Sequence, residues 1–138
     1  MELRQEFWRH ATNEAQKSIA GKFGIYWDDQ MQDWDLVMAD PSWIPQLLNA
    51  YLKGNFTDDE KFAIMELMIA SFDDLVASEV LTTNEHWHSC KSILRTEYWL
   101  HISTILYWSV PDKQDLDEAF PISKYIRPIW DEVKHHFI

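Results

Sequence analysis

The chain has 138 residues, a length that suits one domain with a sizeable hydrophobic core. Hydrophobic residues make up 46% of it and aromatic residues 14%, which excludes intrinsic disorder, and only three glycines favour helices over a turn-rich β-protein. Twelve Lys and Arg residues against 23 Asp and Glu residues give a formal net charge of −11, so we expect no direct binding to nucleic acid or to an anionic membrane.

The cysteine content and the hydrophobic pattern indicate the cellular compartment. The single cysteine, Cys90, cannot form an internal disulfide, which suits a reducing compartment. The first ten residues contain no apolar stretch like that of a secretory signal, and no run approaches the roughly 18 apolar residues of a membrane helix. We therefore predict a cytoplasmic protein.

The first third of the chain combines a predicted helix with an irregular segment. Apolar residues recur every four positions from Glu2 to about Ala20, which predicts a helix that Gly21 ends. Residues 22–40 contain five aspartates interleaved with large aromatic side chains. A short helix over residues 29–38 competes there with an extended conformation.

Two further helices are predicted in the middle of the chain. Ser42 is the best N-cap for the first of them, which Gly54 ends. Thr57 and Glu60 have the capping-box spacing for the second, whose apolar residues then alternate at steps of three and four up to Val76. The short link between the two helices predicts an antiparallel hairpin.

A stretch of roughly residues 83–109 is predicted to be the central helix. It contains no Gly or Pro, and Thr82 with Glu85 has the capping-box spacing. Its second half is apolar on nearly every side, which indicates that neighbouring helices cover it. The sequence thus predicts an all-α fold, a single domain over residues 1–138 in which about five helices form a bundle around this long central helix.

A polar loop follows Pro111, and the chain ends in a predicted helix. A helix that began at Ser123 would be disrupted by Pro128, which lacks an N–H group and clashes with an upstream carbonyl. We therefore expect a short turn over residues 122–127, a break, and a terminal helix from Pro128.

No catalytic motif occurs, and metal ligands are poorly placed. Glu85–His88 and Glu132–His135 match the Glu-x-x-His spacing of di-iron bundles, but the first pair opens a helix and the second lies almost at the C-terminus. Gly-rich phosphate loops and nucleophile motifs are also absent. We expect no metal, no cofactor and no enzymatic activity.

The acidic and aromatic residues are the best candidates for binding. Trp8, Trp27, Trp34 and Trp99 do not fit the apolar stripes well, and any that are exposed would mark a binding surface or a cation–π pocket for a small cation. We expect partner binding by two acidic segments, the first with Trp27, Asp28, Asp29, Asp33, Trp34 and Asp35, and the second with Asp112, Asp115, Asp117 and Glu118.

A small, acidic, Trp-rich helical chain of this kind resembles the bacterial immunity proteins that neutralise toxin domains of contact-dependent inhibition and related systems. The resemblance implies an acidic surface that binds a basic toxin, for example a nuclease, and covers its active site. The alternative is a helical metal- or small-molecule-binding protein or enzyme with a site in the bundle core. The sequence leaves the oligomeric state open.

Overall fold

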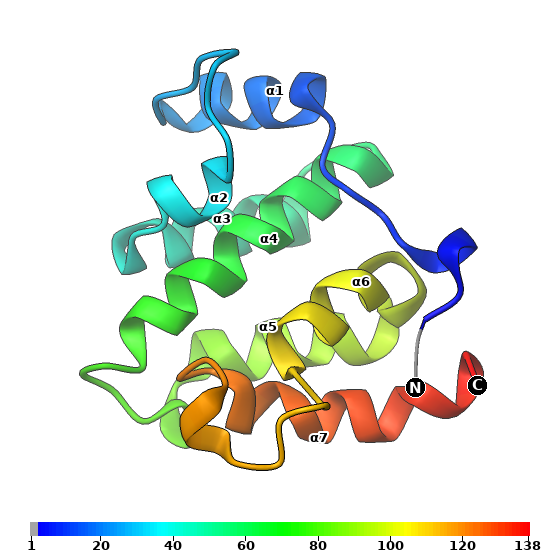
Figure 1. Ribbon diagram of the computed structural model, residues 1–138. Coiled ribbons are helices and arrows are strands. Elements are labelled where there is room, and N and C mark those ends of the chain that lie inside the picture. Colours follow the sequence, from blue (N-terminus) through cyan, green and yellow to red (C-terminus); the bar gives the residue numbers. More distant parts are fainter. Residues whose placement is uncertain (1–2) are drawn as a thin grey trace. The chain divides into compact units, whose positions relative to one another are not determined.

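The computed structural model describes residues 3–138, which form helices, turns and loops without a β-strand (Figure 1). The all-α fold class is therefore confirmed. The α-helices are α1 (Asn13–Phe23), α2 (Trp34–Met38), α3 (Ile44–Lys53), α4 (Asp58–Leu75), α5 (Glu85–Thr96), α6 (Tyr98–Ser109) and α7 (Ser123–Val133). The 3-10 helices are η1 (Gln5–Phe7), η2 (Pro41–Trp43), η3 (Leu81–Thr83), η4 (Leu116–Glu118) and η5 (Lys134–His136).

The described chain divides into two compact units, each organised around one buried helix. Ala11–Leu75 form the α4 unit, in which α1, α2 and α3 contact α4. Residues 3–10 and Val76–Ile138 form the α6 unit, in which α5, α7 and η1 contact α6. Between residues 3 and 138, no helix combines the length and the apolar character needed to cross a membrane.

The helix α4 begins with the predicted capping box. The amide of Thr57 donates to Glu60 Oε1 at 3.1 Å, and the amide of Glu60 donates to Thr57 Oγ1 at 3.2 Å, so two N–H groups at the helix end are satisfied. From Phe62 to Phe72 every residue except Glu66 is buried. The helix therefore provides most of the core of its unit.

The N-terminal segment differs from the predicted helix over residues 2–20. Glu2 lies outside the described residues, and α1 begins only at Asn13, where Thr12 Oγ1 accepts the amide of Ala15 at 3.1 Å. The helix then continues past Gly21, and Gly24 ends it with a left-handed φ of 70° that favours glycine.

The next two helices are shorter than predicted. In the region of the expected 29–38 helix, only Trp34–Met38 are α-helical. Ser42 is not the N-cap of α3, because it lies within η2, which precedes α3. The amide of Ser42 donates to Asp40 Oδ1 at 2.9 Å. The predicted end of α3 at Gly54 is confirmed.

The predicted long helix over residues 83–109 is wrong, because the chain forms two helices that meet at Glu97 and changes direction between them (Figure 1). The hydroxyl of Thr96 donates to the carbonyl of Ser92 at 2.9 Å and lies 3.4 Å from that of Ile93. Such bonds back to the preceding turn bend a helix. Asn84, rather than Thr82, is the N-cap of α5, and its Oδ1 accepts the amide of Trp87 at 2.9 Å.

The helix α7 runs through Pro128 without the predicted break. Because proline has no N–H group, Pro128 removes the hydrogen bond to the carbonyl of Lys124, four residues earlier. Lys124 lies in the first turn of α7, so only this one bond near the start of the helix is lost. Ser123 supports the first turn, since its Oγ accepts the amide of Phe120 at 3.0 Å and donates to the carbonyl of Trp108 at 2.6 Å.

Candidate functional site

The first acidic segment lies in the α4 unit, and Trp34 cannot act there as a binding residue. Its side chain is only 1% exposed, and its indole N–H donates to the carbonyl of Tyr26 at 2.8 Å. Because the N–H group has this partner, the whole ring can be buried at low cost. The prediction that Trp34 contacts a partner is therefore wrong.

The other members of that segment have different environments. Trp27 is half-buried and packs back on α1, with its N–H 3.5 Å from Gln16 Oε1 and Lys17 Nζ 5.8 Å from its ring centroid. Asp28 accepts the hydroxyl of Tyr26 at 2.6 Å, and this bond holds the pKa of the Asp28 carboxyl below its usual value. The remaining exposed acids of the segment are Asp29 and Asp33.

Asp35 turns toward α4 and is half-buried. Desolvation raises its pKa, and its charge also repels that of Glu66, the one residue of the buried α4 stretch that is not fully covered. Burial, together with this repulsion, raises the pKa of Glu66 to about 8. The pair therefore favours a protonated carboxyl at neutral pH and offers a partner less charge than the sequence suggests.

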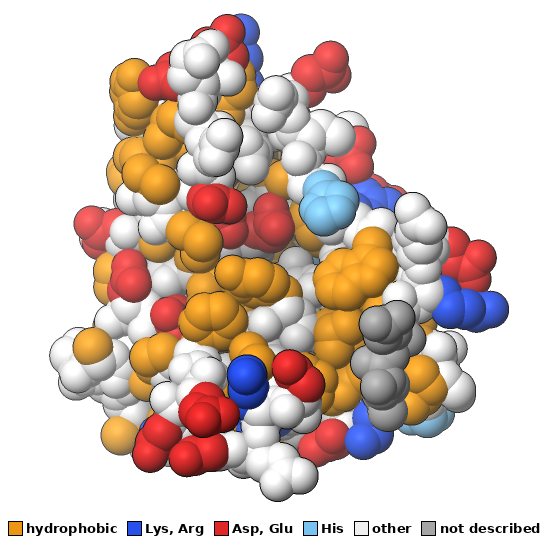
Figure 2. Space-filling view, viewed as in Figure 1, with side chains coloured by type: hydrophobic (Ala, Val, Ile, Leu, Met, Phe, Trp, Pro, Cys, Tyr) orange, Lys and Arg blue, Asp and Glu red, His pale blue; other side chains and the backbone are white. Residues whose placement is uncertain are grey.

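The second acidic segment is a solvated loop in the α6 unit. All four predicted residues are exposed, and none of them forms an ion pair with a described cation. Arg127 fixes the start of the loop by donating to the carbonyl oxygens of Ser109, Val110 and Lys113. Figure 2 shows acidic side chains gathered at the lower end of the view, where Figure 1 places this loop. The four members are Asp112, Asp115, Asp117 and Glu118.

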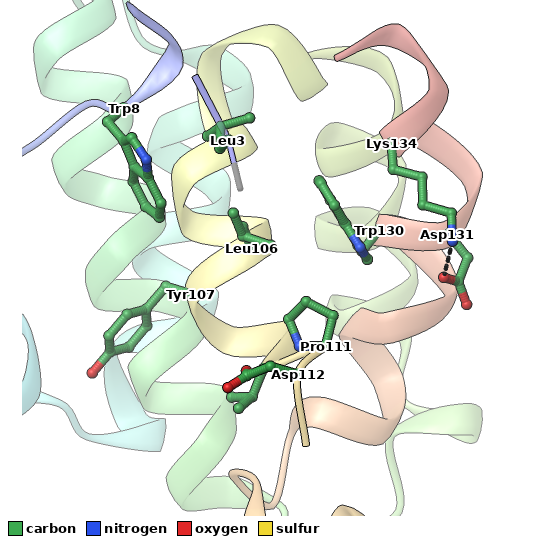
Figure 3. A pocket seen from close by; sticks show the side chains of 10 residues that line it. Leu3, Trp8, Leu106, Tyr107, Pro111, Asp112, Trp130, Asp131 and Lys134 are labelled. Atoms are coloured by element: carbon green, nitrogen blue, oxygen red, sulfur yellow. Dashed lines mark hydrogen bonds and ion pairs between the residues drawn. The ribbon is translucent and has the colours of Figure 1, made fainter. Parts of the chain in front are cut away.

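A cleft of about 920 Å³ adjoins the loop (Figure 3). Its walls come from the N-terminal segment, the end of α6, the start of the loop, α7 and the start of η5. Trp8 and Tyr107 are its exposed aromatic residues, with 41% and 48% of their surfaces accessible. The lining residues are Leu3, Trp8, Leu106, Tyr107, Val110, Pro111, Asp112, Trp130, Asp131 and Lys134.

The N-terminal segment is held in place on both sides of Trp8. The amide of Arg9 donates to Ser103 Oγ at 3.3 Å, and the same hydroxyl donates to the carbonyl of Arg9 at 3.1 Å. The ring of Phe7 packs edge-on against Phe137, with centroids 4.9 Å apart. These contacts present Trp8 to the cleft from a fixed backbone.

Charge and aromatic surface together define what the cleft can bind. Lys134 and Asp131 form an ion pair at 3.2 Å, which leaves Asp112 as the unpaired charge among the lining residues. A cation placed over the face of Trp8 or Tyr107 is attracted by the ring, and a nearby carboxylate adds to the attraction. The cleft is therefore suited to a basic group.

Sequence reasoning identified part of this site. Asp112 was predicted, and Trp8 was recognised as an aromatic residue outside the apolar stripe, whereas Tyr107 was missed because it lies within an apolar run. Trp99 is also exposed, at 56%, but does not line the cleft. Only the tertiary fold brings Trp8 and Tyr107 to the same cleft.

Within the described part of the chain, no group of three or more His, Cys, Asp or Glu side chains is arranged to hold a metal ion. Cys90 is fully buried, and desolvation raises the pKa of its thiol far above the usual value. His101 is buried within α6.

We compared the chain with protein-family models, with curated protein sequences and with solved structures, and none of the three comparisons gave a match. The function proposed below therefore rests on the cleft and on the charge of the acidic loop.

Proposed function

We propose that this chain is an acidic protein-binding module that neutralises a basic protein partner, in the manner of an immunity protein that covers the active site of a toxin. The observation that carries the proposal is the cleft of the α6 unit, which exposed Trp8 and Tyr107 line together with Asp112 at the start of the acidic loop. No catalytic group or cofactor is required for this function.

Each part of the site has a separate role in binding. Exposed Trp and Tyr side chains supply large contact areas at low entropic cost and recur among binding hot spots. We infer that an Arg or Lys side chain of the partner enters the cleft, where cation–π attraction to an exposed ring and the negative charge of Asp112 both favour it. The four loop acids, within a chain of net charge −11, steer a basic partner to the cleft.

Affinity capture from the native cell extract tests this function. The loop variant replaces Asp112, Asp115, Asp117 and Glu118 by their amides, and a matched control replaces Glu14, Asp58, Asp74 and Glu85, which are exposed in the described structure and change the net charge equally. We expect the wild type and the control to capture a basic protein in a salt-sensitive complex and to inhibit its activity. The loop variant should bind it at least tenfold more weakly.

Two results would contradict the proposal. One is a partner without basic character, and the other is equal binding by the loop variant and its control. Either result would mean that the acidic loop does not recognise a basic partner.

The volume of the cleft favours a second candidate, a small organic cation as the ligand. Small-molecule sites have volumes of about 300–1,000 Å³, and the cleft falls in this range. Titration of the purified chain with a quaternary ammonium compound, followed through tryptophan fluorescence, distinguishes the candidates. Saturable quenching that Trp8→Ala abolishes would support the small cation.

A further inference from the structure

A groove of about 480 Å³ lies elsewhere in the α6 unit, between η3, α5 and α7. Its lining contains two lysines, one histidine and no carboxylate, so its charge is opposite to that of the acidic loop. The lining residues are Thr82, Trp87, His88, Lys91, Lys124, Tyr125 and Pro128.

Several contacts fix the walls of this groove. The rings of Trp87 and Tyr125 meet edge-on with centroids 6.2 Å apart, and the Tyr125 hydroxyl accepts the amide of Leu81 at 3.3 Å. On α5, His88 Nε2 lies 2.8 Å from the carbonyl oxygen of Thr82. Trp87, Tyr125 and His88 are therefore held in place before any ligand enters.

The two lysines keep their positive charges uncompensated. Neither Lys91 nor Lys124 forms an ion pair with a described carboxylate, although acids outnumber basic residues almost two to one. Lys124 Nζ lies 5.2 Å from the ring centroid of Tyr125, so one cation sits over an aromatic wall. In so acidic a chain, two unpaired lysines on one groove create a local positive field.

We propose that this groove binds a phosphate monoester carried on a small planar or apolar body. A phosphate monoester carries a charge of about −1.5 to −2 at neutral pH, which Lys91 and Lys124 balance with their two positive charges. Lysine ammonium groups bind phosphate as point charges, and His88 and Thr82 add polar groups at the same groove. Tyr125 and Pro128 offer the surface on which the rest of the ligand packs. The site is separate from the proposed partner cleft.

Nuclear magnetic resonance titration with phenyl phosphate tests the proposal, with inorganic phosphate and phenol as separate probes. We expect phenyl phosphate to shift the amide signals of residues 82–91 and 124–128, and to bind at least tenfold more tightly than either probe. Lys91→Gln and Lys124→Gln should each weaken its binding about tenfold, the loss of one charge-assisted contact. Lys53→Gln, an equal charge change on α3 in the α4 unit, should leave it unchanged.

Far-UV circular dichroism of each variant establishes that the helices are intact, which is expected because both lysines project from the surface of the groove. Signal shifts outside the two segments would overturn the proposal. Equal affinity of the wild type and the Lys91→Gln/Lys124→Gln double variant would overturn it as well.

Discussion

Replacement of Glu66 by glutamine is expected to stabilise the protein, and increasingly so as the pH rises. The Glu66 carboxyl lies within the buried stretch of α4 beside Asp35, and burial followed by repulsion raises its pKa from 4.5 to about 8. Between these two values the folded chain keeps a proton that the unfolded chain has released. Stability contributed by this protonation is complete below pH 4.5 and is lost as the pH rises through 8.

The magnitude follows from the displacement of the pKa. At about 1.36 kcal/mol per unit, the rise from 4.5 to about 8 sets a limit of about 4.8 kcal/mol. Because the side chain keeps some contact with water, which screens its charge, we expect about 2–3 kcal/mol. Glutamine has nearly the same shape and never ionises. The free energy of unfolding of Glu66→Gln should therefore exceed that of the wild type by this amount at pH 8 and be almost equal to it at pH 4.5.

Urea unfolding at several pH values between 4 and 8 measures the difference, and Glu60 supplies a control on the same helix. The hydroxyl of Ser18 at 2.7 Å, the amide of Thr57 and the nearby ammonium of Lys22 lower the pKa of Glu60 to about 2. Its ionised form therefore stabilises the fold above pH 4.5, and this stability is lost as the pH falls through 2. Glu60→Gln should therefore destabilise the protein at pH 7, whereas Glu66→Gln should stabilise it.

A stability difference between Glu66→Gln and the wild type that does not change with pH would refute this reasoning. It would mean that the Glu66 carboxyl ionises in the folded chain as it does in water. A loss of stability in the variant at pH 8 would have the same meaning.

Three further substitutions, two of them paired with a control substitution, test the site, the core and a helix boundary. Trp8→Ala should weaken partner binding at least tenfold, whereas Trp99→Ala, outside the cleft, should leave the dissociation constant unchanged. Equal effects of the two substitutions would mean that Trp8 does not lie in the interface. Trp34→Ala should cost about 3–5 kcal/mol in urea unfolding, and a cost below about 1 kcal/mol would contradict its burial. Asn84→Ala should cost about 1 kcal/mol by the same measurement and Thr82→Ala much less, whereas the reverse order would make Thr82 the N-cap of α5.

Local sequence signals predicted the parts of the fold that depend on neighbouring residues. Thr57, Glu60 and the apolar spacing after them located α4 to within one residue at each end, because a capping box and a helical stripe both act within one or two turns. No Gly or Pro marks the boundary between α5 and α6 at Glu97 in the sequence. It depends on where the hydroxyl of Thr96 bonds and on how α6 packs, which adjacent residues do not determine.

The aromatic residues show why the site could be predicted only in part. Trp8 and Trp34 both lie off the apolar stripes, yet the first is exposed and the second is buried. The carbonyl of Tyr26 accepts the indole N–H of Trp34, so the ring of Trp34 is buried without leaving that polar group unpaired. Pairing a tryptophan with a distant backbone carbonyl, or bringing it to the same cleft as Tyr107, is a property of the tertiary fold.

The proposed cleft and groove both take lining residues from α7, and no residue lines both of them. Successive residues point about 100° apart around a helix, so Lys124 and Asp131 lie on nearly the same face about two turns apart, whereas Tyr125 and Trp130 point about 140° apart. The buried residues Ile126, Ile129 and Val133 occupy the sector between them and face the core. The two proposals are tested by substitutions of different residues, so failure of either proposal would not count against the other.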